Sequence, residues 1–170
     1  MKERRDPPPG RPKTDQPPRG AATREAAERG GTRFTDDYLG YLLGQANHAL
    51  FKEFDAQVRE AGLGSLEWRV LAVLSGESPM AVGQLAHEVL SQQPTVTKLL
   101  QRLVAQGWVA LHDDPADQRR TLVSITPAGQ KKVAPLLRRA RAHEAAMLAE
   151  LSATEVQRLK TQLKRLAQPR

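Results

Sequence analysis

The segment DPADQRRTLVSITPAG, residues 114–129, carries the clearest structural signal in this chain. It follows an amphipathic stretch at 91–107 that ends in glycine. Turn-forming residues at 113–118 and the β-branched run at 121–125 predict a β-hairpin with basic residues near its tip. The threonine and proline that follow predict the start of a helix, because threonine caps helices well and proline fits the first helical position. The sequence thus orders an amphipathic helix, a basic hairpin and a new helix in direct succession.

Helical periodicity continues on both sides of this segment. Apolar residues recur every three or four positions over 39–58, and Thr35 or Asp36 is placed to cap that helix. The capping-box pattern Ser152-x-x-Glu155 opens a last helix with an apolar seam. In chain order we expect helices at 35–62, 65–74 (capped by Ser65), 82–90 and 91–107 (capped by Ser91), strands at 108–111 and 121–125, and helices at 127–150 and 152–167.

This succession predicts a mainly α-helical fold with a small β-hairpin wing. It is the order of a winged helix-turn-helix, with residues 65–126 as a DNA-reading head inside a domain spanning 34–170. The flanking helices, at 35–62 and 127–167, keep apolar surface that their own helix cannot bury. We expect them to pair two copies of the chain into a homodimer. A two-fold dimer would place two recognition helices about one DNA turn apart, on a roughly palindromic site.

The expected recognition helix has one apolar and one polar face. Amides, hydroxyls and cations on the polar face suit base edges and phosphates in the major groove. At the hairpin tip, Arg119 is expected to enter the minor groove, where negative potential is concentrated, and Arg120 to contact phosphate. Asp117 is expected to hold the Arg119 guanidinium by a charge-assisted pair. The candidate DNA-contacting residues are Ser91, Gln92, Gln93, Thr95, Thr97, Lys98, Gln101, Arg102, Asp117, Arg119 and Arg120.

The spacing Asp117-x-Arg119, followed by the run 125–129 with the pattern Ile-Thr-Pro-x-Gly, resembles the MarR family of bacterial transcriptional regulators. Residues 35–167 follow that family's order of elements. The resemblance implies a homodimer formed through the terminal helices, and a repressor that a small aromatic or phenolic acid releases from DNA. The chain departs from the family at 109–113, where members often carry a basic residue and this chain has His112.

The resemblance also suggests where an effector would bind. The candidate ligand-binding residues are Tyr41, His48, Phe51 and Trp68. Plain core packing is the alternative for Phe51 and Trp68, because large aromatic side chains are usually buried for packing alone. His48 has the alternative of a surface or interface position. The sequence names no ligand.

Composition limits the remaining function classes. The chain has 170 residues, no cysteine and a net charge of +7, so disulfides and thiolate metal sites are excluded. Residues 1–33 hold nine basic and five acidic residues and six of the twelve prolines, which predicts a disordered basic arm that is either a solvated tail or a DNA-touching segment. The rest holds 17 basic and 14 acidic residues, so a nucleic-acid surface there depends on local clustering.

Two competing functions are weighed against the regulator. An enzyme is not expected, since the chain has no nucleophile elbow, Gly-rich phosphate loop or HExxH run, and its four histidines lack metal-ligand spacing. No catalytic residue, cofactor or metal is therefore assigned. The alternative is an architectural protein that binds DNA without sequence choice or ligand response. No apolar run is long enough for a membrane span and no secretory signal is found, so a cytoplasmic protein without a membrane partner is expected.

Overall fold

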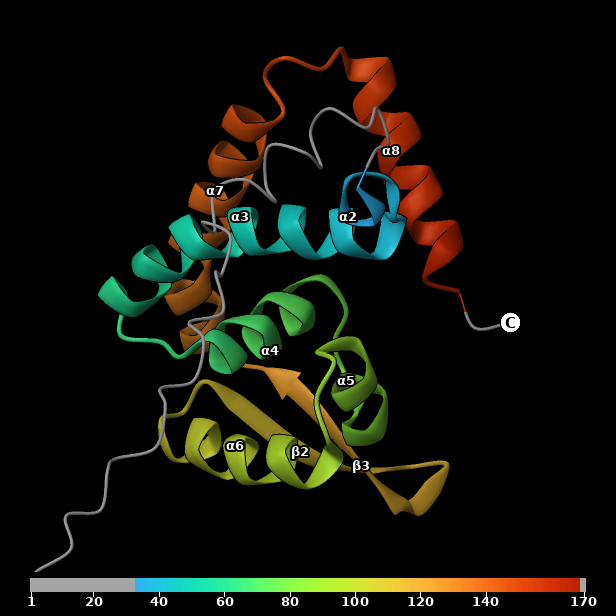
Figure 1. Ribbon diagram of the computed structural model, residues 1–170. Coiled ribbons are helices and arrows are strands. Elements are labelled where there is room, and N and C mark those ends of the chain that lie inside the picture. The colour runs from blue at the N-terminus through green and yellow to red at the C-terminus, as the bar shows by residue number, and fades with distance from the viewer. Residues whose placement is uncertain (1–32, 169–170) are drawn as a thin grey trace, which may run out of the picture. The chain divides into compact units, whose positions relative to one another are not determined.

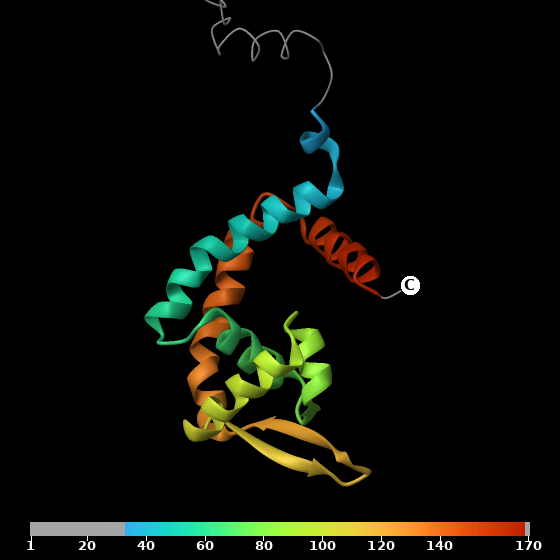
Figure 2. The same cartoon turned by 60° about the horizontal axis from the view of Figure 1, so that its bottom comes forward.

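The computed structural model describes residues 33–168, apart from the side chain of Gln118, so the predicted arm at 1–33 lies outside it except for Arg33. One unit of the structure ends at Gly44 and a larger one begins at Gln45. Figures 1 and 2 show the elements. They are α2 (Phe34–Asp37), α3 (Leu39–Glu60), α4 (Ser65–Gly76), β1 (Met80–Ala81), α5 (Val82–Glu88), α6 (Gln93–Ala105), β2 (Val109–Asp114), β3 (Asp117–Ile125), α7 (Pro127–Met147) and α8 (Ala153–Leu166).

The first unit corrects the expected start of the first helix. A single helix from residue 35 was predicted, but Tyr38 has an extended backbone (φ −77°, ψ 110°) that separates the one-turn α2 from α3. The Tyr38 ring stacks on Phe34, with 4.7 Å between ring centroids. Asp36 caps no helix, because its carboxylate pairs with the Arg33 guanidinium at 3.1 Å, which lowers the pKa of Asp36.

The larger unit contains a three-stranded antiparallel sheet in the order β1-β3-β2. The hairpin of β2 and β3 was predicted, and it extends beyond the helices that it follows and precedes in the chain (Figure 2). Strand β1 was not predicted, since residues 75–79 were expected to form a loop leading into a helix. Its two residues pair with Leu122 and Val123 of β3, and so short a strand carries no period-two pattern for sequence reasoning to find.

The core of the larger unit joins the end of α3 to α4, α5, α6, the sheet and α7. Trp68 of α4 is only 9% exposed and packs against Phe54 of α3, with 5.3 Å between ring centroids. Leucines from four helices make the centre of this core, and they fix α6 by its apolar face. The fully buried leucines are Leu71, Leu74, Leu85, Leu100, Leu103 and Leu136.

Two of the expected helix caps are wrong. Gln92, not Ser91, is the N-cap of α6, because the Ser91 N–H donates to the Ala86 carbonyl and closes the end of α5. Helix α4 begins at Ser65 with Gly64 as its cap residue, and the Ser65 hydroxyl donates instead to Asp55 at 2.6 Å. Serine is a common cap, but here Ser91 closes the preceding helix and Ser65 binds an aspartate of α3 instead.

The caps of the last two helices are confirmed. Thr126 Oγ1 accepts from the Gly129 N–H at 3.1 Å and opens α7, with Pro127 in its first turn. Ser152 and Glu155 form the capping box of α8: the Ser152 N–H donates to Glu155 Oε2 at 2.8 Å, and the Glu155 N–H donates to Ser152 Oγ at 3.3 Å.

The base of the wing is a tight junction between α6, the sheet and α7. Gly107 turns the chain out of α6 with φ +70°, a conformation that favours glycine. Thr126 binds this turn twice: its N–H donates to the Trp108 carbonyl at 3.0 Å, and its hydroxyl donates to the Gly107 carbonyl at 2.6 Å. Gly129 packs against the same backbone, so that an added Cβ would lie 2.1 Å from the Trp108 carbonyl oxygen.

We predict that Gly129→Ala lowers the free energy of unfolding by about 1–3 kcal/mol or more, because the clash is with backbone and the wing base must shift. Urea unfolding followed by circular dichroism measures the change. Gly76→Ala is the matched control, since a Cβ there meets no atom within 4 Å. A Gly129→Ala protein as stable as the Gly76→Ala protein would contradict the close packing.

We also predict that Ser152→Ala raises the pKa of Glu155 toward its ordinary value. The hydrogen bonds from Ser152 lower that pKa. Their contribution to the stability of α8 is therefore fully present at pH values above the ordinary pKa of glutamate, and it is lost as the pH falls through the lowered pKa. NMR titration of the Glu155 carboxyl measures the shift, with Thr154→Ala in the same turn as the control. An unchanged pKa in Ser152→Ala would show that the capping box does not set it.

Candidate nucleic-acid interface

Helix α6 presents a wide polar face to solvent. Its apolar residues Val96, Leu99, Leu100 and Leu103 are buried in the core. The burial of this stripe leaves the opposite side of the helix open over more than half a turn. Six of the predicted DNA-contacting residues lie on that exposed side: Gln93, Thr95, Thr97, Lys98, Gln101 and Arg102. Ser91 and Gln92 precede the helix, and Ser91 is half-buried.

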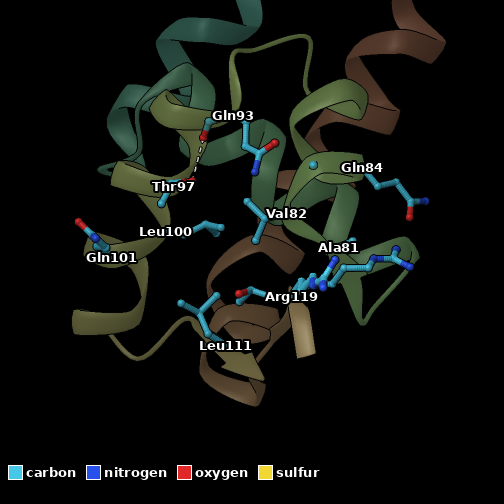
Figure 3. A pocket seen from close by; sticks show the side chains of 12 residues that line it. Ala81, Val82, Gln84, Gln93, Thr97, Leu100, Gln101, Leu111 and Arg119 are labelled. Atoms are coloured by element: carbon cyan, nitrogen blue, oxygen red, sulfur yellow. Dashed lines mark hydrogen bonds between the residues drawn. The ribbon is translucent and has the colours of Figure 1, made fainter. Parts of the chain in front are cut away.

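A hollow of about 570 Å³ lies between α6, the start of α5 and the wing. Figure 3 shows Gln93 and Thr97 of α6 on one side of it and Arg119 on the other, with Val82 and Leu100 between them. Gln101 extends away from the other labelled side chains (Figure 3). Arg120 also lines the hollow. The structure therefore brings together candidates from two separate stretches of the sequence.

Carboxylates organise the tip of the wing. Asp114 is only 9% exposed; its Oδ1 accepts from the Ala116 N–H at 2.9 Å, and its Oδ2 lies 3.7 Å from Arg120 Nε. Asp117 Oδ1 accepts from the backbone N–H of Arg119 at 3.0 Å. The predicted pair between Asp117 and the Arg119 guanidinium is therefore wrong, because Asp117 orients the Arg119 backbone instead. Asp114 was missed as a positioning residue, although aspartates in turns often bind an N–H two residues on.

His112 lies on the first wing strand, β2. Its Nε2 lies 2.7 Å from Ser124 Oγ on the neighbouring strand. His112 therefore has a partner across the hairpin, on the exposed part of the sheet.

The opposite edge of α6 faces the beginning of α4. Thr95, Lys98 and Arg102 line a groove of about 650 Å³ there, together with residues 64–67. The Arg102 guanidinium donates to Glu67 Oε1 at 3.2 Å. Sequence reasoning missed Glu67, because nothing in the periodicity of α4 places it beside a residue 35 positions further along the chain.

The three ligand candidates in the larger unit do not lie in one site. His48 and Phe51 of α3 line a hollow of about 570 Å³ with charged residues of α3 and α4, among them Lys52, Arg59 and Arg69. Trp68 lies in the core against Phe54, which favours the core-packing alternative for it. Tyr41 belongs to the first unit.

Metal and membrane sites were also sought among residues 33–168. Within that range no group of three or more histidine or carboxylate side chains is arranged to hold a metal ion. None of the described helices has the length and apolar character needed to span a membrane.

Comparison with known proteins agrees with this geometry. The family model described as MarR family matches residues 61–120, which run from the start of α4 into the wing. The solved structure of the MarR family transcriptional regulator SPO1453 from Silicibacter pomeroyi DSS-3 is 33% identical, with a TM-score of 0.68. The match covers 79% of this chain and 96% of that one. The chain belongs to the MarR family.

Curated MarR-like relatives include regulators of both signs. The homoprotocatechuate degradative operon repressor of Escherichia coli is 30% identical over 94 residues, which cover 55% of this chain and 64% of the repressor. The transcriptional activatory protein BadR of Rhodopseudomonas palustris is 33% identical over 95 residues, 54% of each chain. Three further regulators are matched over 72%, 60% and 59% of their own lengths. This MarR family member is therefore similar to HTH-type transcriptional regulators over about half of its own length.

Proposed function

We propose that this protein is a homodimeric, sequence-specific transcriptional repressor that binds double-stranded DNA through α6 and the wing. The observation that carries the proposal is the hollow that Gln93 and Thr97 share with Arg119 and Arg120. It gives one surface two modes of DNA contact: amides and hydroxyls for base edges in the major groove, and an arginine for the adjacent minor groove. Such a regulator acts on the chromosome, and in a bacterium that means the cytoplasm.

The proposed DNA contacts follow the exposed face of α6 and the wing tip. The residues are those expected from the sequence, namely Ser91, Gln92, Gln93, Thr95, Thr97, Lys98, Gln101, Arg119 and Arg120, with Asp117 acting through the Arg119 backbone. Arg102 was also expected from the sequence, but its guanidinium is paired with Glu67. Thr97 already donates its hydroxyl to the Gln93 carbonyl at 2.9 Å, so its methyl group is the part most available to a base.

Exposed apolar faces support the dimer. Along α8, Leu159, Leu163 and Leu166 are 42%, 38% and 58% exposed and repeat at helical spacing. Apolar stripes of this kind on a helix are usually covered by another helix. A second copy of the chain is the covering partner that we propose, and its two-fold symmetry would favour a roughly palindromic operator.

The proposal also includes repression of transcription and release of the DNA when a small ligand binds. The similarity to the repressor from Escherichia coli supports repression, although the sign also depends on where the operator lies. The hollow at His48 and Phe51 supports an effector site, because it offers an aromatic side chain beside cations. A small aromatic or phenolic acid has the matching chemistry, since its ring packs on Phe51 and its carboxylate attracts Arg69, whereas Arg59 is already paired with Asp55.

We predict that Arg119→Ala weakens binding to the operator by about 1–3 kcal/mol, or about 5- to 150-fold in Kd, without changing thermal stability. Fluorescence anisotropy with the DNA upstream of the protein's own coding region measures the affinity, and excess random duplex serves as competitor. Arg138→Ala is the charge-matched control, because Arg138 is exposed on α7 and is not among the residues lining the hollow.

The same titration separates the two DNA-binding alternatives. Binding that survives the competitor and fails in Arg119→Ala would support a sequence-specific regulator. Equal competition by the random duplex at every upstream fragment would favour the architectural alternative. Sedimentation of the complex reports whether two chains bind one operator, and a single bound chain would contradict the dimer.

For the effector, we predict that benzoate or 4-hydroxyphenylacetate releases the DNA and that Phe51→Ala raises the acid concentration needed by about tenfold, as expected for loss of one aromatic contact. Affinity for DNA without the acid should stay unchanged, because Phe51 is not among the residues of the DNA-facing hollow. Lys164→Ala on α8 is the control. Release by the acids at the same concentration in both variants would place the effector site elsewhere.

A further inference from the structure

Glu67 lies beside the recognition helix although it belongs to α4. Its carboxylate makes two contacts at once: Oε2 accepts from the Gly64 N–H at 2.7 Å, and Oε1 accepts from the Arg102 guanidinium at 3.2 Å. The side chain of Glu67 is only 16% exposed, whereas that of Arg102 is 68% exposed. The anion is therefore fixed in place, and the cation that it holds is the mobile partner of the pair.

The contact with Gly64 prevents Glu67 from turning away. Glu67 lies in the first turn of α4, where a carboxylate favours the positive end of the helix dipole and binds a free N–H of the helix start. Both of its oxygens are thus occupied, one by its own helix and one by α6. Moving Arg102 to another anion would leave a largely buried carboxylate without its second partner, which costs free energy.

The groove around this pair is the edge of α6 that lies away from the wing. Lys98 and Thr95 line it together with Arg102. A cation in this position would ordinarily neutralise a DNA phosphate and release a counterion, which adds to the salt dependence of binding. Lys98 is exposed and forms no ion pair with any of the residues that the structure describes. Lys98 and Arg102 are thus neighbouring cations on one edge of α6, but only Arg102 is paired with a carboxylate of the described residues.

We propose that Glu67 is a positioning residue that holds Arg102 on α4 and thereby limits the electrostatic part of DNA binding. This rests on the proposed DNA interface and refines the roles within it. Lys98 contributes a phosphate contact, whereas Arg102 contributes little while Glu67 is charged.

The test compares the salt dependence of binding to a random duplex for the full chain and its Glu67→Gln, Arg102→Ala and doubly substituted variants. Glutamine keeps the size of Glu67 and its acceptor for the Gly64 N–H but removes the charge. We expect Glu67→Gln to steepen the slope of log K against log salt by about one unit, as for one more phosphate contact. Arg102→Ala should leave the slope unchanged, and the double variant should behave like Arg102→Ala.

Two results would overturn the proposal. One is an unchanged slope in Glu67→Gln; the other is a slope that steepens equally when Arg102 is alanine, because the carboxylate would then act on DNA without Arg102. Thermal melting of each variant shows whether the fold is intact. Arg102→Ala leaves the α4 cap untouched. A slope of log K against log salt that becomes shallower by about one unit in that variant would also count against the proposal. If the unsubstituted protein binds no duplex at all, the proposed function itself fails.

Discussion

The close contact between Gly129 and the Trp108 backbone is the constraint on which the proposed DNA-binding surface depends. The end of α6, the start of β2, the end of β3 and the start of α7 meet at this point. Thr126 binds the same turn through both its backbone and its hydroxyl, so the base of the wing is fixed at two places. Because the hairpin is anchored there, the distance from Arg119 to the polar face of α6 follows from the length of two paired strands rather than from a flexible loop.

Carboxylates set the positions of cations throughout this surface. Asp114 pairs with Arg120, Asp117 orients the backbone of Arg119, and Glu67 holds Arg102. A protein whose described part is only mildly basic relies on where its cations point, since a large overall charge is not available to attract DNA. Anions beside the arginines reduce non-specific attraction and favour particular side-chain directions, which suits the sequence-specific regulator proposed above.

Lys132 links α3, the helix that lines the hollow at His48 and Phe51, to the base of the wing. Its Nζ donates to the Ala61 carbonyl, just after the end of α3, at 2.8 Å and lies 5.0 Å from the centroid of the Trp108 ring. Helix α3 carries His48 and Phe51, and Trp108 begins the hairpin that carries Arg119. A displacement of the end of α3 would therefore strain a contact made directly with the wing base, in a core too closely packed to absorb it.

Local patterns in the sequence determined most of the elements. The 3.6-residue periodicity, the Thr-Pro-x-Gly start of α7 and the Ser152 capping box predicted the helices and the hairpin in the right order, because those signals depend on neighbours within one or two turns. The polar face of α6 and the basic wing tip could be recognised for the same reason. The sequence alone could not predict the features that depend on partners distant in the chain. The strand β1, the loss of Ser65 as a cap, and the pairing of Glu67 with Arg102 were all decided by tertiary contacts. A serine or glutamate binds whichever partner the folded chain brings closest, and only the packing of α4, α6 and the sheet determines which partner that is.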